Sequence, residues 1–586
     1  MDREPIVGID LGTTNSEVAF IFDGQPRVIK ENDDGIVPSC VGLDPDGKVM
    51  VGTPARNQYI VSPERTVVSI KRKMGSVERV PMGEEYYSPQ EISAFILKAL
   101  KERAERALGR PVRKAVVTVP AYFTDVQRQA TREAGEIAGL EVVRIINEPT
   151  AAALAYGSHS TDPQKILVYD LGGGTFDVSV VSIEAGVVEV LASIGDNHLG
   201  GDDFDQMVQE HLIEYLEGTL GLSSVREDRA LQARLRRAAE RAKIELSDAP
   251  YARVEEDHVG EVGGQSRHLS LELSRLDFEQ DIEEALSQTM RAVTTALNDA
   301  AVRPSELEKI LLVGGSTRIP RIGELLWERL GQEPHDEVDP DLCVALGAAV
   351  QAGMEMGIDV QSVLVDITPY TFGTSAIGQL YGRPYAHQFV PLIRRNAKLP
   401  ATRTEVFFTM YEDQESVQVQ VFQGEDPDAL KNVKIGNFVF QGLNQKAGAN
   451  QQGILLTYSL DLDGLLQIHA VERATGQEIR GVIENATGRS TPEELDAYRE
   501  RVAGLWGDEA VEGEVPWSEA EVGDDLPDEM RETLERAGVA LDRAAAEDRE
   551  EIINLMEDIR DALREGRLDN ARESKQELDE ILFYLG

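Results

Sequence analysis

The chain has 586 residues, of which 41% are hydrophobic and 28% charged, and its formal charge at pH 7 is −45. A chain of this length is too long to fold around one hydrophobic core, so we expect several domains. The negative charge predicts that the protein binds neither nucleic acids nor anionic membrane surfaces, because both require a basic protein surface. No apolar run approaches the roughly 18 residues of a membrane-spanning helix.

The first part of the chain, to about residue 360, alternates strand-like and helix-like patterns, which predicts an α/β architecture. Strands are expected at 5–10, 17–22, 114–119, 142–146, 166–170, 178–183 and 310–313. Helices are expected at 89–108, 125–138, 202–217, 227–246 and 277–301.

From Asp366 to about Asn485 the helix pattern gives way to period-2 alternation. In residues 417–421 the valines lie on one face of the expected strand and the glutamines on the other. A tight turn is expected at Asp463-Gly464. This part of the chain therefore predicts an antiparallel β domain with one buried face.

The last segment, from Ser490, has a helical pattern again. Ser490 is expected to cap this helix, with Pro492 in its first turn and Glu493 three residues after the cap. The very acidic stretch 508–529 is interpreted as a loop. After it, a small helical bundle could bury Leu534, Leu541, Ile552, Leu555, Met556, Ile559 and Leu563. We interpret the acidity as a solvated face, with an acidic recognition site as the alternative.

The cysteines, Cys40 and Cys343, lie far apart in the sequence. A reducing cytoplasm is the simplest setting for them, and the start of the chain lacks a signal-peptide pattern. We interpret each cysteine as a small buried hydrophobe. The histidines form no pair at ligand spacing, so we expect no zinc.

A short phrase occurs twice, as Ile6 to Thr14 and as Ile166 to Thr175, and each copy ends an apolar strand in an aspartate and a glycine turn. The glycines allow backbone N–H groups to cradle an anion, and Asp10 and Asp170 can hold a hydrated cation. Two such hairpins facing each other predict a clamp for the phosphates and metal ion of one nucleotide.

Two further patterns fit the same nucleotide. The glycine turn from Gly314 to Arg318 suits a backbone that passes under an adenine ring, with the guanidinium stacked on it. Glu240, Lys243 and Ser247 share one face of a helix and could grip ribose and base, although surface charge pairing is an open alternative.

Hydrolysis of a γ-phosphate requires positioning, charge neutralisation and a residue that orients water. Lys71 could supply positive charge, Glu148 lies where a strand becomes a helix, and Asp177 could reach the attacking water from a strand face shared with Thr175. Taken singly, Lys71 and Glu148 would be surface residues.

Together these motifs resemble the DnaK-type family of 70-kDa heat-shock chaperones along nearly the whole chain. The resemblance rests on the phrases Asp10–Thr14, Val119–Phe123, Asn147–Ala153, Asp170–Asp177, Leu199–Asp205 and Gly314–Pro320. It implies an α/β actin-like ATPase domain of duplicated ribonuclease-H-like lobes at 1–360 and an interdomain linker at 361–366. A β-sandwich peptide-binding domain would follow at 367–487 and an α-helical lid at 488–586.

The resemblance also implies roles in binding and hydrolysing ATP. Asp10 and Asp170 would hold Mg²⁺ through water, and Lys71, Glu148 and Asp177 would arrange the attacking water, with K⁺ as a further ion. The other residues implied to bind ATP or ADP are Gly12, Thr13, Thr14, Gly172, Gly173, Gly174, Thr175, Gly200, Gly201, Glu240, Lys243, Ser247, Gly314, Gly315, Ser316, Arg318 and Asp341.

The resemblance also implies that a further set of residues transmits the nucleotide state between the domains. Pro120 and Arg128 resemble the family's nucleotide switch, and Arg144, Asn147 and Asp366 match the patch where a J-domain co-chaperone docks. The linker carries Val363, Leu364, Val365 and Asp366. If its three aliphatic side chains each contribute about 1.5–3 kcal/mol on burial, docking supplies much of the roughly 5.5 kcal/mol that a near-complete switch needs.

The β domain resembles the family's site for extended apolar peptides of unfolded or client proteins. Ile377 and Met410 would arch over the peptide, while Phe407, Val417 and Val419 would line the pocket. The alternative is that these side chains belong to the sandwich core.

Some segments depart from the family pattern. The stretch from Met74 to Ser88 is short, which leaves the need for a nucleotide-exchange factor open, and Ala503 to Asp528 has no family match. These features resemble the short, specialised HscC-type members.

Two rival functions compete with an ATP-driven chaperone. An actin-like small-molecule kinase would have no use for a β domain and a lid. A non-cycling relative that only binds clients is disfavoured by the presence of Lys71, Glu148, Thr175 and the linker.

Overall fold

The computed structural model describes residues 4–506, apart from 158–162, 336–338, 359, 361–362, 410–413, 415, 442–452, 474–475, 477, 480 and 485–489, together with Thr533, Lys575 and Leu578. The chain divides into a unit of Met1–Asp508 and a unit of Glu509–Gly586. The first unit is described below. The loop predicted at 508–529 and the helical bundle predicted after it fall outside the described residues.

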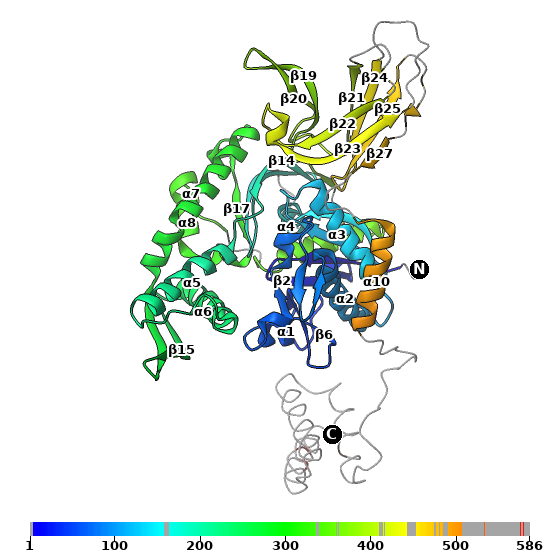
Figure 1. Ribbon diagram of the computed structural model, residues 1–586. Coiled ribbons are helices and arrows are strands. Elements are labelled where there is room, and N and C mark those ends of the chain that lie inside the picture. Colours follow the sequence, from blue (N-terminus) through cyan, green and yellow to red (C-terminus); the bar gives the residue numbers. More distant parts are fainter. Residues whose placement is uncertain are drawn as a thin grey trace. The chain divides into compact units, whose positions relative to one another are not determined.

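The first hairpin of the repeated phrase lies at the centre of a sheet with the strand order β11-β10-β1-β2-β3, of which β2 is labelled in Figure 1. β1 is antiparallel to β2, with Asp10 opposite Glu17, and parallel to β10. Residues 6–11 are all buried because the strand has a covered face on each side. The strands are β1 (Ile6–Leu11), β2 (Asn15–Phe22), β3 (Gln25–Val28), β4 (Ile36–Pro38), which also pairs with β2, β10 (Lys114–Val119) and β11 (Glu141–Asn147).

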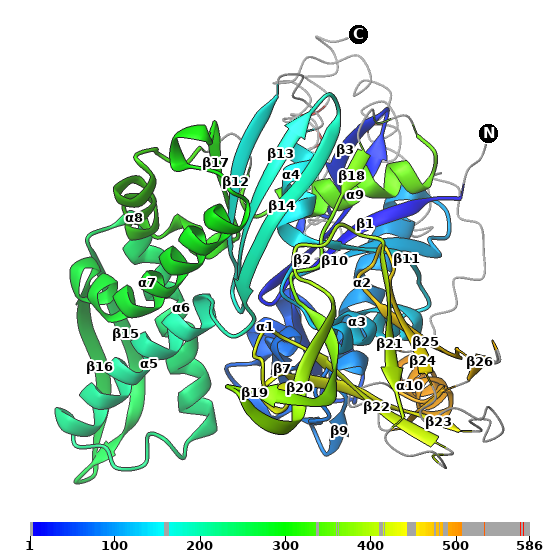
Figure 2. The same ribbon diagram turned by 90° about the horizontal axis from the view of Figure 1, so that it is seen from above.

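The second hairpin repeats this arrangement in a sheet ordered β17-β12-β13-β14-β18, in which Figure 2 shows β12, β13 and β14 side by side. Asp170 lies opposite Asp177, and β12 runs parallel to β17 just as β1 runs parallel to β10. The predicted duplication is therefore confirmed at the level of strand pairing. The strands are β12 (Gln164–Leu171), β13 (Phe176–Glu184), β14 (Val187–Asp196), β17 (Lys309–Val313) and β18 (Val363–Val365).

Two apolar helices, α4 (Glu148–Gly157) and α9 (Cys343–Glu355), pack against each other between the two sheets. A Cβ atom on Gly347 would lie 1.8 Å from the carbonyl oxygen of Ala151, so only glycine permits this approach. Cys343 is buried in the same cluster and Cys40 is buried in β5, as predicted.

The remaining elements of the α/β part cover the outer faces of the sheets or extend from them. Every strand and helix predicted for residues 1–360 is present, whereas the polar hairpin of β15 and β16 is not apparent from the pattern. The elements are α1 (Thr53–Gln58), α2 (Pro89–Leu108), α3 (Asp125–Ile137), α5 (Gly201–Gly218), α6 (Arg229–Asp248), α7 (Arg275–Asp299), α8 (Pro320–Leu330), β5 (Cys40–Leu43), β6 (Val49–Val51), β7 (Thr66–Val68), β8 (Val80–Met82), β9 (Glu85–Tyr87), β15 (Tyr251–Val262) and β16 (Gln265–Ser274).

The β part contains a sheet ordered β20-β19-β22-β23-β27 and another ordered β21-β24-β25-β26, with an apolar core between them. Val419 and Val421 point into this core, and the predicted turn at Asp463-Gly464 joins β24 to β25 with φ +75° at the glycine. The strands are β19 (Phe372–Leu380), β20 (Arg383–Ile393), β21 (Ala401–Phe408), β22 (Ser416–Gln423), β23 (Val433–Gln441), β24 (Gly453–Leu460), β25 (Leu466–Glu472), β26 (Glu478–Ile479) and β27 (Gly481–Glu484).

The last described helix, α10 (Pro492–Trp506), begins one residue later than predicted. Thr491, not Ser490, caps it: the Glu494 N–H donates to the Thr491 hydroxyl, and the Thr491 N–H donates to the Glu494 carboxylate. The prediction of Ser490 as the cap is wrong, since its hydroxyl donates instead to Glu133 of α3 at 3.0 Å. The tertiary contact thus decides between two adjacent capping residues.

Candidate nucleotide site

A cleft of about 340 Å³ opens between the two hairpin turns. Its lining includes most residues that the sequence assigns to a nucleotide, and these come from both sheets, from α6 and from the turn after β17. They are Asp10, Gly12, Thr13, Thr14, Lys71, Glu148, Asp170, Gly172, Gly173, Thr175, Glu240, Lys243, Ser247, Gly314, Gly315, Ser316, Arg318 and Asp341. This volume lies within the range of small-ligand sites.

The two glycine turns meet across the cleft, as the repeat predicts. A Cβ atom on Gly173 would lie 2.0 Å from the hydroxyl oxygen of Thr14, so the turns approach as closely as glycine allows. Gly174, Gly200 and Gly201 do not line the cleft. The Gly201 N–H instead donates to the carbonyl of Gly172 at 2.9 Å, which supports the second turn from behind.

The aspartates that end the first strand of each hairpin, Asp10 and Asp170, are buried in the floor of the cleft. The Thr118 hydroxyl donates to Asp10 at 2.6 Å, and one oxygen of Asp170 is buried without a hydrogen-bond partner. Burial raises the pKa of both carboxyl groups, and for Asp170 the charges of Glu148, Asp177 and Asp10 add to the effect. Carboxylates without enough countercharge fit a hydrated divalent cation.

No cluster of His, Cys, Asp and Glu side chains close enough to enclose a metal ion occurs in the described part of the chain.

Lys71 and Glu148 form a buried ion pair beside the aspartates. Burial disfavours the charge of Lys71, but Glu148, Asp10 and Asp170 outweigh it, so the lysine pKa is raised and the side chain stays charged. Burial raises the pKa of Glu148 to about 7 even though Lys71 acts in the opposite direction. Lys71 and Glu148 are therefore buried, and the alternative that each is a surface residue is wrong.

Asp177 is placed differently from the prediction. It does not line the cleft, and its carboxylate accepts hydrogen bonds from the N–H groups of Ala121 and Tyr122 at 2.9 and 3.1 Å. The strand begins at Phe176, so Thr175 lies in the turn that precedes it. Asp177 therefore ties the second hairpin to the segment that follows Pro120.

The far end of the cleft is bordered by α6 and by the turn after β17. Lys243 pairs with Asp205 at 2.8 Å, and burial raises the pKa of Asp205 to about 6. Arg318 is expected to stack on adenine, and in this structure it pairs with Asp341 at 2.6 Å. Ser247 donates to the carbonyl of its own helix at Lys243.

Some contacts of the site are not apparent from the sequence. Arg56 of α1 pairs with Glu240 at 2.7 Å and thereby joins opposite sides of the cleft, and Thr118 and Asp205 hold predicted residues in place. Thr118 offers a weak signal, because it lies near the end of the strand expected at 114–119. Arg56 offers none, since its partner is distant in sequence, whereas Asp205 is the last residue of the Leu199–Asp205 phrase.

The linker residues join the edge of the second sheet. Val363 to Val365 pair in parallel with Val187 to Glu189, and the Val363 N–H donates to the Gly186 carbonyl at 2.8 Å. Val363 is 58% exposed, so burial of its side chain contributes less than the sequence-based estimate assumes. Backbone pairing carries more of this contact than predicted.

The residues expected to report on the nucleotide form one hydrogen-bonded group. Arg128 donates to Asn147 at 2.6 Å and to the carbonyl of Ala121 at 3.0 Å. Asn147 in turn donates to Asp366 at 3.0 Å. Pro120 is buried beside them at the end of β10.

The turn between β24 and β25 lies against the same group. Asp463 accepts from the Ile145 N–H at 3.0 Å, pairs with Arg132 and lies 3.6 Å from Arg144. The predicted turn residues thus also connect the β part with the α/β part.

The residues predicted to bind peptide are only partly brought together. Val419 is buried in the sandwich core, with Phe407 and Val417 half-buried against it, while Ile377 is 61% exposed. Met410 lies outside the described residues. The core alternative therefore fits Val419 best.

Comparison with known proteins agrees with this geometry. A family model described as Hsp70 protein matches residues 6–585. The chain is 42% identical over 578 residues to the chaperone protein DnaK of Thermotoga neapolitana, covering 96% of this chain and 93% of the relative. It is 40% identical over 584 residues to that of Thermosipho africanus, covering 98% and 95%. The chain belongs to the Hsp70 family.

As an Hsp70, the chain is an ATPase and an ATP-dependent chaperone, and the predicted fold class is confirmed where the structure describes it. The domain boundaries and the likeness to HscC-type members stay predictions. Within the described residues, no helix has the length and apolar character to cross a membrane.

Proposed function

We propose that ATP hydrolysis in the cleft controls the capture and release of extended apolar peptide segments by the β domain and the lid. Lys71 and Glu148 would position the attacking water, and Thr13, Thr14 and Thr175 would contact the phosphates. Asp177 would act on the water only through the Ala121–Tyr122 backbone that it binds.

The observation that carries this proposal is that Asn147 and Glu148 are adjacent in the sequence but contact different parts of the molecule. Glu148 pairs with Lys71 at the phosphate end of the cleft, and the preceding residue, Asn147, donates to Asp366 of the linker. If the end of β11 shifts on hydrolysis, the hydrogen bond between Asn147 and Asp366 would transmit the shift directly to the linker, because both of these side chains are buried.

The ions are proposed to be Mg²⁺ and K⁺. Asp10 and Asp170 would hold Mg²⁺ through water, and the ion would neutralise charge that develops on the phosphates. The unpartnered oxygen of Asp170 supports this assignment, since a buried carboxylate oxygen is costly to leave unsatisfied.

The partners are proposed to be client polypeptides and a J-domain co-chaperone. The co-chaperone would dock on Arg144, Asn147 and Asp366, and it would compete with Asp463 for Arg144, which is only 12% exposed at its side chain. Such competition would loosen the contact between the β part and the α/β part. A cytoplasmic setting and the need for a nucleotide-exchange factor stay predictions.

Single-turnover ATP hydrolysis tests this function directly. The full chain is loaded with ATP, and the cleavage rate is measured alone, with an extended apolar peptide and with a J-domain protein. We expect each addition to accelerate cleavage. Cleavage that neither addition accelerates would overturn the proposed coupling, even if the unstimulated rate is normal.

A further inference from the structure

A second, smaller cavity of about 70 Å³ lies beside the first glycine turn. It shares Thr13, Thr14, Asp205 and Glu240 with the nucleotide cleft, so the two spaces adjoin at the turn. None of the functional assignments above uses this cavity as a site.

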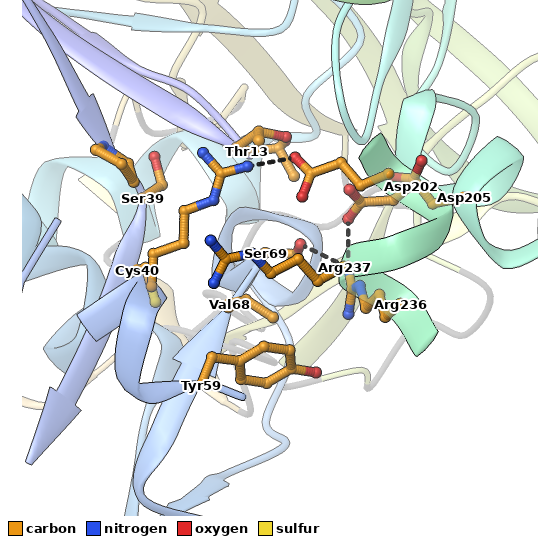
Figure 3. Close-up of a pocket in the computed structure, with 14 residues that line it drawn as sticks. Thr13, Ser39, Cys40, Tyr59, Val68, Ser69, Asp202, Asp205, Arg236 and Arg237 are labelled. Carbon is orange, nitrogen blue, oxygen red and sulfur yellow. Dashed lines mark hydrogen bonds and ion pairs between the residues drawn. The ribbon is translucent and has the colours of Figure 1, made fainter. Parts of the chain in front are cut away.

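The cavity is bordered by elements from opposite sides of the α/β part. Figure 3 shows Ser39 and Cys40 on one side of it and Arg236 and Arg237 of α6 on the other. Arg56 of α1 also contributes to the lining. Three guanidinium groups therefore border a space too small for a second nucleotide.

Two of these guanidinium groups are already neutralised. Arg56 pairs with Glu240 at 2.7 Å, and Arg236 pairs with Asp202 at 3.2 Å. The Arg236 side chain also donates to the Ser69 hydroxyl at 3.1 Å, an interaction marked by a dashed line in Figure 3. These pairs build the walls of the cavity and leave no surplus charge.

Arg237 differs from the other two. Among the residues that the structure describes, it has no ion-pair or hydrogen-bond partner, although it is half-buried in the cavity wall. The remaining carboxylate of the lining, Asp205, forms an ion pair with Lys243 at 2.8 Å. The local balance is therefore positive, with a planar five-donor group facing the space.

The other lining groups do not oppose an anion. Burial raises the pKa of the Cys40 thiol to about 12, so it is uncharged near neutral pH. Thr14 and Tyr59 add hydroxyl groups to the wall. The space of about 70 Å³ also suits a small oxyanion: at about 10–15 Å³ for each water-sized sphere, it holds roughly five to seven, which is enough for the five non-hydrogen atoms of phosphate.

We propose that this cavity is a binding site for inorganic phosphate, with Arg237 as its charged ligand. The phosphate can come from the solvent or from hydrolysis in the adjoining cleft, and the second source rests on the proposed role of that cleft. Charge-assisted hydrogen bonds from an arginine fork are the strongest recognition available for such an anion.

The equilibrium test isolates this cavity from the cleft. The full chain is saturated with a non-hydrolysable ATP analogue, which fills the cleft, and inorganic phosphate is titrated by calorimetry. We expect saturable binding that Arg237→Ala weakens about tenfold or more, since hydrogen bonds to charged groups are worth this much. Arg241→Ala is the matched control, because Arg241 is an exposed arginine of the same helix.

Arg237→Gln serves as a second variant of nearly the same size, and circular dichroism verifies that each variant folds. Equal phosphate affinity of the wild type and both folded Arg237 variants would overturn the proposal, as would the absence of saturable binding in the wild type.

A kinetic arm separates the two sources of phosphate. During a single turnover, cleavage of ATP is followed by acid quench and free phosphate by a fluorescent phosphate sensor. If the cavity holds the product, release lags behind cleavage and Arg237→Ala shortens the lag about tenfold. An unchanged lag assigns the site to phosphate from the solvent. Failure of ATP cleavage would contradict the proposed function but leaves the titration readable.

Discussion

Asn147 donates a hydrogen bond of 3.0 Å to Asp366, and both side chains are buried. Asn147 ends strand β11 and Asp366 ends the linker, so this bond connects the α/β part to the start of the β part. The next residue after Asn147 is Glu148, the partner of Lys71. The residue proposed to position the attacking water and the residue that contacts the linker are therefore adjacent in the sequence.

Loss of the buried lysine should slow hydrolysis without abolishing nucleotide binding. Lys71→Met keeps the length of the side chain but removes the charge that offsets Glu148, Asp10 and Asp170. We expect single-turnover cleavage to fall by about 10²–10³-fold, a typical loss for one electrostatic group in a buried site. A cleavage rate within about threefold of the wild type would contradict the assigned role, and ATP affinity measured in parallel serves as the control.

The turn at Asp463 should control how fast ATP releases a bound peptide. Asp463→Asn weakens its pair with Arg132 and its approach to Arg144 while retaining the shape of the turn. We expect ATP-triggered peptide release to slow about threefold to tenfold in a stopped-flow assay. The control is Glu405→Gln, which removes one exposed charge from the same domain. Equal release rates in the two variants would argue against the turn as a coupling contact.

Nucleotide affinity should depend on pH through Asp205. Burial raises the pKa of this carboxyl to about 6, so the ion pair with Lys243 forms as the pH rises through that value and is lost as the pH falls through it. We expect ADP affinity to decrease between pH 7 and pH 5, with Lys243 released from its position beside the cleft. In Asp205→Asn this pH dependence should be absent; if it persists unchanged, another group is responsible.

The same shift has a consequence for stability with the opposite sign. Because the folded-state pKa of Asp205 lies above its ordinary value, the folded protein binds the proton more tightly than the unfolded chain does between about pH 4 and pH 6. The contribution of this carboxyl to stability therefore falls as the pH rises through that window. Denaturant midpoints of wild type and Asp205→Asn across this range measure it.

Helix α10 should depend on Trp506 for its packing on α2. The indole stacks on Phe95 with ring centroids 6.2 Å apart and donates to Glu102 at 2.6 Å. Trp506→Ala removes this partly buried side chain, so amide hydrogen exchange in α10 should accelerate by about tenfold. Trp327→Ala is the control, because that indole is 55% exposed. Unchanged exchange in α10 would contradict this packing role.

The sequence predicts the regular parts of the molecule well because they follow local rules. The two Asp-Gly hairpins, the buried valines of β22 and the helix at 89–108 all rest on periodicity and turn chemistry that neighbouring residues determine. The nucleotide cleft is predictable for a related reason, since the duplicated turn leaves few ways to place its glycines.

Residues that depend on distant partners are the ones that sequence reasoning misses. Asp177 is expected to reach the attacking water because of its two-residue spacing from Thr175, but its carboxylate accepts hydrogen bonds from the N–H groups of Ala121 and Tyr122, which lie 56 and 55 residues away in the sequence. Ser490 does not cap its helix because its hydroxyl donates to the distant Glu133, and Thr491 caps the helix instead. Arg56 carries no local signal at all, since its partner is 184 residues away.

A double-mutant cycle on Asn147 and Asp366 tests the central claim most directly. Single-turnover hydrolysis is measured with and without an apolar peptide for the wild type, Asn147→Ala, Asp366→Ala and the double variant. If their hydrogen bond transmits the signal, each single variant loses most of the peptide stimulation and the double variant loses no more than either. Independent, additive losses, or stimulation that survives in both single variants, would contradict the claim.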